Sequence, residues 1–72
     1  MDKIIYSTKA VPFEYYQYKA YRIEVDVTDP NHTFQRHIWI DKNDDIIESE
    51  WIKTPKQTVE QLIYRNYYKI GE

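Results

Sequence analysis

The chain has 72 residues, 42% of them hydrophobic, with ten basic and twelve acidic side chains and no cysteine. A chain this short makes one small domain, which leaves little room for a water-excluding active site. The absence of cysteine excludes a disulfide framework and a thiolate metal site, and the near balance of charge disfavours nucleic acid as a partner. No apolar run is long enough to cross a membrane, and MDKIIYSTKA lacks the apolar region of a signal peptide. We therefore expect a cytoplasmic protein with no membrane partner.

The first two predicted elements are strands, at residues 3–8 and 14–28. Within the second, Ala20–Thr28 alternates between apolar and polar side chains, which is the pattern of a strand with one buried face. The apolar face carries Tyr21, Ile23, Val25 and Val27, and the polar face carries Arg22, Glu24, Asp26 and Thr28. We expect the apolar row to line the core.

A turn at residues 29–32 (DPNH) precedes a third predicted strand at residues 34–41. Its two faces carry Phe34, Arg36, Ile38 and Ile40 on one side, and Gln35, His37 and Trp39 on the other. A second turn at residues 41–45 leads into a shorter strand at residues 46–51.

The turn DKNDD begins like a calcium-binding loop, because it has the pattern D-x-N-x-D. Ile46 and Ile52, however, stand where that loop requires glycine and glutamate. The pattern therefore predicts a hairpin turn, with Asn43 and Asp44 at positive φ.

The last predicted element is a helix over residues 55–70. Thr54, Pro55 and Gln57 have the spacing of a capping box with proline in the first turn. The apolar residues that follow recur at helical spacing, at Val59, Leu62, Ile63, Tyr67 and Ile70. Gly71 is placed to end the helix in the left-handed conformation. The predicted fold class is a small antiparallel α+β domain, a three- or four-stranded meander with this C-terminal helix on one sheet face.

The stretch EYYQYKAYR at residues 14–22 contains four tyrosines. If the strand runs through it without a bulge, Tyr16 and Tyr18 point away from the core, onto the face that the helix leaves open. Tyrosine, tryptophan and arginine are enriched where proteins bind one another. The predicted protein-contact surface consists of Tyr16, Tyr18, Arg22, His37 and Trp39.

Two alternatives to this surface remain open. A register slip of one residue, or a bulge near Gln17 and Lys19, would turn Tyr16 and Tyr18 from the open face to the core face without affecting Tyr21. The tyrosines can also reflect an AT-rich genome, since the chain has ten isoleucines, one leucine, and seven lysines against three arginines. In that case they are ordinary surface residues of a small sheet.

The end of the predicted helix suggests a second kind of surface. Tyr64, Arg65, Tyr68 and Lys69 interleave aromatic and basic side chains, as single-stranded nucleic-acid binders do. The same residues equally fit tyrosines packed over a small core and cations at a helix C-terminus. The overall charge favours the second interpretation.

No catalytic, cofactor-binding or metal-binding residues are predicted. His32 and His37 have no convincing third ligand for zinc, and the single glycine excludes a glycine-rich phosphate loop. We expect a non-catalytic protein-binding or regulatory module, whose partner is another protein or a second copy of itself. Its size suits an accessory protein of a mobile genetic element. The alternative is a single-stranded nucleic-acid-binding domain.

Overall fold

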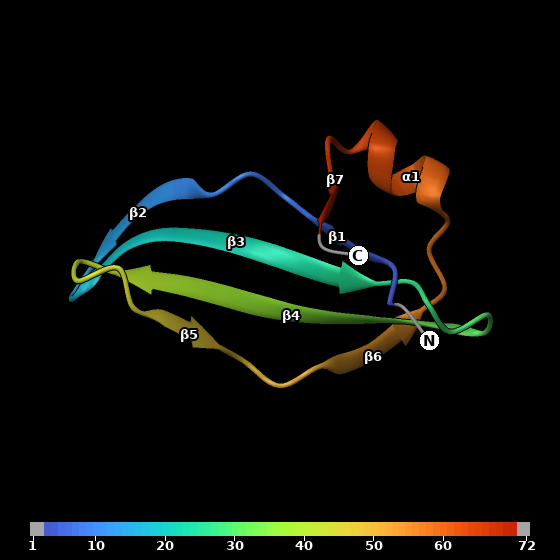
Figure 1. Cartoon of the computed structure of the whole chain (residues 1–72), viewed down its shortest axis with the longest axis horizontal. Coiled ribbons are helices and arrows are strands. Elements are labelled where there is room, and N and C mark those ends of the chain that lie inside the picture. Colours follow the sequence, from blue (N-terminus) through green and yellow to red (C-terminus); the bar gives the residue numbers. More distant parts are fainter. Residues whose placement is uncertain (1–2, 71–72) are drawn as a thin grey trace.

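The computed structural model describes residues 3–70, in which seven strands form one antiparallel sheet beside a single short helix (Figure 1). In chain order the elements are β1 (Ile5–Ser7), β2 (Val11–Tyr15), β3 (Tyr18–Asp26), β4 (His32–Asp41), β5 (Ile46–Glu48), β6 (Ile52–Pro55), α1 (Val59–Tyr64) and β7 (Tyr68–Ile70). The prediction of a three- or four-stranded α+β meander with a long C-terminal helix is wrong, because the described residues are mostly β.

The centre of the sheet is the long hairpin formed by β3 and β4. Each outer edge of this hairpin is covered by two shorter strands, β1 and β2 along β3, and β5 and β6 along β4. β7 pairs with the outer edge of β1. Figure 1 shows the β2–β3 and β4–β5 turns at one end of the hairpin, with α1 and β7 towards the other. The two ends of the sheet are therefore covered differently.

Two hydroxyl groups explain why the edge strands are interrupted. Ile23 and His37 are cross-strand partners in the middle of the central hairpin. The Ile23 amide donates to Thr8 Oγ1 at 3.0 Å, and the His37 amide donates to Ser49 Oγ at 2.8 Å. Because a side-chain oxygen replaces the usual backbone carbonyl, each edge segment bends away and starts a new strand after the break. The predicted strand at residues 46–51 is broken in this way at Ser49.

The predicted strand at residues 14–28 is also broken, by a tight turn at Tyr16 and Gln17 that joins β2 to β3. Tyr15 pairs with Tyr18 across this turn, and Tyr16 has φ 56°. A left-handed backbone of this kind favours glycine or asparagine. The sequence therefore lacks the usual signal for the hairpin that it forms.

The helix begins four residues later than predicted, at Val59. Thr58 and Gln61 form the capping box, with the Gln61 amide donating to Thr58 Oγ1 at 3.1 Å and the Thr58 amide donating to Gln61 Oε1 at 3.0 Å. Thr54 instead lies in β6, where its hydroxyl donates to the Thr33 carbonyl at 3.0 Å. The residue before a proline prefers extended backbone, which fits Thr54 to a strand.

The helix also ends earlier than predicted, because Asn66 adopts φ 68° just after it. The Asn66 amide donates to the Ile63 carbonyl and the Tyr67 amide to the Leu62 carbonyl, both at 2.9 Å. This pair of bonds is the Schellman motif, which closes a helix with a left-handed residue. The predicted cap at Gly71 lies outside the described residues.

The core lies between α1 and one end of the sheet. It consists of the buried side chains of Tyr6, Val25, Val27 and Leu62, with Ile23 and Tyr67 packed against them. Tyr67 follows the Schellman turn and packs against the core cluster that contains Leu62, as the hydrophobic residue after this motif commonly does. The sheet face that α1 covers at this end continues, without a helix, to the other end of the hairpin.

A candidate protein-contact face

The register of the central hairpin decides which predicted site residues meet. Tyr21 pairs with Trp39 and Ile23 pairs with His37, so both residues lie on the face of Tyr21. Arg22 pairs with Ile38 and lies on the opposite face. Arg22 therefore lies apart from His37 and Trp39, and the prediction that these three residues share one surface is wrong.

An irregularity in the pairing brings Tyr18 to the same face as Trp39. The register of β3 against β4 shifts between Tyr18 and Ala20, so Lys19 is an extra residue in the ladder. A shift of one residue moves a side chain to the other face of a sheet. The Tyr18 and Trp39 rings lie with centroids 6.4 Å apart. Tyr18, Tyr21, His37 and Trp39 thus share one surface.

Six rings form a continuous cluster on this surface, which we call the aromatic face. Its members are Phe13, Tyr15, Tyr18, Tyr21, His37 and Trp39. Phe13 lies between three of the tyrosines, with its centroid 5.9 Å from Tyr21, 6.1 Å from Tyr15 and 6.4 Å from Tyr18. These separations are typical of favourable aromatic pairs. Phe13, Tyr15 and Tyr21 were not among the predicted contact residues.

Tyr21 and His37 hold the middle of the aromatic face together. The Tyr21 hydroxyl and His37 Nδ1 share a hydrogen bond of 2.5 Å, and their rings are stacked with centroids 5.8 Å apart. Burial, and then the neighbouring Tyr67 phenol, raise the pKa of the Tyr21 hydroxyl. The Tyr21 phenol therefore has a hydrogen-bond partner, and Tyr21 lies on the same sheet face as Ile23, which packs against the core beneath α1.

The aromatic face is partly open to solvent, and further exposed apolar side chains flank it. Tyr15 is 55% exposed, and Val11 and Ile47 lie beside Tyr21 and Trp39 in the register at 49% and 39% exposed. At the turn, Tyr16 is 75% exposed, and its ring meets Tyr15 edge-on at 4.2 Å. Aromatic and aliphatic side chains thus form a contiguous patch beyond the reach of α1. Exposed apolar patches are common where proteins bind partners, which makes this patch a candidate contact surface.

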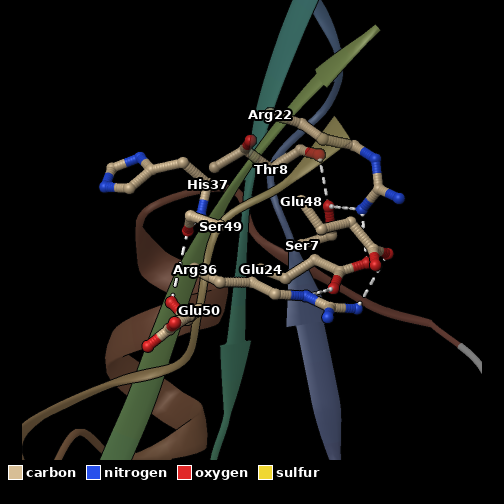
Figure 2. Close-up of polar contacts among 9 residues, drawn as sticks. All are labelled: Ser7, Thr8, Arg22, Glu24, Arg36, His37, Glu48, Ser49 and Glu50. Atoms are coloured by element: carbon tan, nitrogen blue, oxygen red, sulfur yellow. Dashed lines mark hydrogen bonds and ion pairs between the residues drawn. The ribbon is translucent and has the colours of Figure 1, made fainter. Parts of the chain in front are cut away.

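The opposite face carries a network of ion pairs (Figure 2). Glu24 is buried, and its carboxylate accepts from Arg22 Nη1 at 2.7 Å and from Arg36 Nε at 2.8 Å. Arg22 also donates to Ser7 Oγ at 3.2 Å, and Arg36 pairs with Glu48 at 3.2 Å. Burial alone would raise the pKa of the Glu24 carboxyl, but the two arginines outweigh it and hold the pKa below its ordinary value of 4.5.

Every member of this network has a partner within the chain. Among the described residues, no buried side-chain nitrogen or oxygen lacks a hydrogen bond. The Arg36 guanidinium also stacks on the Trp51 ring, 4.4 Å from its centroid. The network and Trp51 therefore cover their own face, with Ile38 fully buried among them. Arg22 has a structural role here and lies away from the aromatic face.

The four residues of the predicted nucleic-acid surface do not form one helical row. Tyr64 is the last residue of α1, Arg65 follows it, and Tyr68 and Lys69 belong to β7. Tyr68 pairs with Ser7 while Lys69 pairs with Tyr6, so these two side chains belong to opposite faces of the sheet. A hollow beside the helix is lined by Tyr64, Arg65, Thr58, Gln61 and the acidic Glu60.

Asp41 organises the β4–β5 turn. Asp41 accepts from the amides of Asn43 and Asp45, and Asp44 takes φ 69°, which forms the β4–β5 turn. Within residues 3–70, no three His, Cys, Asp or Glu side chains are grouped so as to hold a metal ion. In the same residues no helix is long and apolar enough to span a membrane.

Comparison with protein-family models, curated proteins and solved structures shows no match to this chain.

Proposed function

We propose that this chain is a small non-catalytic protein-binding module, which receives its partner on the aromatic face. The observation that carries the proposal is the continuous cluster of six rings at the end of the sheet that α1 leaves open. Rigid aromatic side chains bury a large area on binding at little cost in side-chain entropy. They are also the residue types that dominate protein interfaces.

The conformation of Tyr16 supports the proposal. A tyrosine at φ 56° costs free energy that glycine would avoid, and apart from its edge-on contact with Tyr15 its side chain is largely solvated. Unfavourable backbone conformations of this kind are concentrated at functional sites. A role in contacting a partner accounts for an aromatic residue at this position.

The proposal is tested by comparing two surfaces of the same protein. The double variant Tyr18→Ala/Trp39→Ala removes two rings of the aromatic face, and Tyr64→Ala removes a ring that is 89% exposed on α1. Each protein is immobilised, shown to be folded by its thermal transition, and incubated with lysate of the source cells. We expect a protein that is captured by the wild type and by Tyr64→Ala, and lost by the double variant.

The size of the expected effect follows from the behaviour of other interfaces. An aromatic anchor contributes about 2 kcal/mol or more to binding, which corresponds to roughly a thirtyfold change in Kd for each ring. Identical capture by the wild type and the folded double variant would contradict the proposal. So would micromolar binding of a single-stranded oligonucleotide at physiological salt that requires Arg65 and Lys69, which would favour a nucleic-acid-binding function.

A further inference from the structure

We infer that the partner presents a basic segment, with arginine or lysine side chains that stack on the aromatic face and reach carboxylates at its border. This inference rests on the function proposed above and adds the chemistry of the partner. It is carried by the placement of aromatic and acidic residues at the same end of the sheet. The acidic residues are not evenly distributed along the chain, and the most acidic stretch lies beside the rings.

The acidic residues are concentrated where the aromatic face lies. Residues 11–21 and 37–50 include this end of the sheet, and apart from Glu48, which pairs with Arg36 on the opposite face, they contain five carboxylates against two lysines. The β4–β5 turn adjoins the β2–β3 turn, since the Lys42 amide donates to the Gln17 carbonyl at 2.8 Å. Asp44, Asp45 and Glu50 are exposed here, and we call these three the acidic border.

The position of the acidic border makes its charges available to a ligand on the rings. Asp44 and Asp45 belong to the turn that follows Asp41, the partner of Tyr18 in the register. Glu50 follows Ser49, whose amide donates to the carbonyl of His37 at 2.9 Å. Lys19 pairs with Asp44 and offsets part of this charge. With Lys19 and Lys42 counted, carboxylates still outnumber cations at this end of the sheet, which favours a cationic ligand over nucleic acid.

Arginine is the side chain best suited to a surface that presents both aromatic rings and carboxylates. Its planar guanidinium stacks on an aromatic ring and still donates hydrogen bonds to carboxylates at its edge. The chain itself contains an example of this geometry on its other face, where Arg36 lies on Trp51 and pairs with Glu24 and Glu48. Tyr18 and Trp39, with the acidic border beside them, can hold a partner's arginine in the same manner.

The same charges disfavour a second copy of this chain as the occupant. Two copies docked through their aromatic faces would bring two acidic borders towards each other. Like charges placed opposite one another across an interface weaken association. A partner of opposite charge avoids this repulsion and associates faster, because the excess of carboxylates steers it to the site.

The inference is tested with a displayed library of random short peptides, selected on the immobilised wild-type protein. Peptides that also bind Trp39→Ala or Tyr18→Ala are discarded, so that those kept depend on the aromatic face. Both variants are first shown to unfold cooperatively. We expect the retained peptides to be enriched in arginine and lysine over the starting library.

Charge variants then measure the contribution of the acidic border. The triple variant Asp44→Asn/Asp45→Asn/Glu50→Gln should weaken binding of a retained peptide roughly tenfold, because three exposed charge pairs are lost. Asparagine tolerates the left-handed backbone of residue 44, so the turn is preserved. Glu60→Gln, which neutralises an exposed carboxylate on α1, is the control and should leave Kd unchanged.

The outcomes separate this inference from the proposed function. Retained peptides that are neutral or acidic, with a Kd that the triple variant does not change, overturn the basic partner and leave protein binding standing. If no selected peptide depends on Trp39 or Tyr18, both the inferred basic partner and the proposed protein-binding function are wrong. A concentration-dependent dimer in sedimentation that Trp39→Ala abolishes would identify a second copy as the occupant and overturn the inference.

Discussion

Replacing Glu24 by glutamine should destabilise the protein by about 2 kcal/mol. Removing one member of a buried ion pair typically costs about 3–5 kcal/mol, because it leaves uncompensated charge. Here the cost is reduced, since the Arg22 and Arg36 side chains are 20% and 21% exposed and keep Ser7 and Glu48 as partners. Glutamine also retains one carbonyl acceptor. Urea denaturation measures the difference in free energy of unfolding.

Glu48→Gln is the matched control, because the Glu48 side chain is 46% exposed and its ion pair should contribute less than about 1 kcal/mol. The effect of Glu24→Gln should also depend on pH. Because the folded-state pKa of Glu24 lies below 4.5, its stabilisation is fully present above that pH and is lost as the pH falls through the folded-state value. The wild type and Glu24→Gln should therefore become equally stable in acid. A cost no larger than that of Glu48→Gln, or one independent of pH, would refute the reasoning.

Two further predictions concern the helix cap and the tyrosine turn. Thr58→Ala should lower the free energy of unfolding by about 1 kcal/mol, because the Gln61 amide loses its acceptor, and an unchanged urea midpoint would show that Thr58 is not the cap. Tyr16→Gly should raise the free energy of unfolding by about 0.5–1 kcal/mol, because relief of the left-handed strain exceeds the entropy cost of glycine. The same variant should bind the partner more weakly. A loss of stability in Tyr16→Gly would mean that the ring contributes to the fold.

The alternating stretches of the sequence were informative about the centre of the sheet. β3 falls within the predicted strand at residues 14–28, and β4 covers the predicted strand at residues 34–41 but begins two residues earlier, at His32, which was predicted to lie in a turn. The alternation could not reveal how the two strands align. One extra residue at Lys19 changes the face on which Tyr18 lies, and that shift depends on the turn at Tyr16, which has no sequence signal. The grouping of Arg22 with His37 was wrong for the same reason, because register is a property of two strands.

The start of the helix was mispredicted because two N-capping patterns compete in the sequence. Thr54 and Thr58 are each followed three residues later by glutamine, and only the second forms the cap. The hydrogen bonds of Thr54 and Gln57 to Thr33 decide the outcome, and these are tertiary contacts between distant segments. The breaks at Thr8 and Ser49 depend similarly on hydroxyls meeting the central hairpin. Local propensity cannot foresee such contacts.

The most direct test of the aromatic face uses the two tryptophans as internal probes. Trp39 lies on the aromatic face, whereas Trp51 packs on Arg36 on the opposite face. Two-dimensional NMR resolves their indole N–H signals in one sample, during titration with the protein or peptide that the wild type captures. We predict that the Trp39 signal shifts on binding while the Trp51 signal stays in place. A shift of Trp51 alone, or binding that moves neither indole, would contradict recognition by the aromatic face.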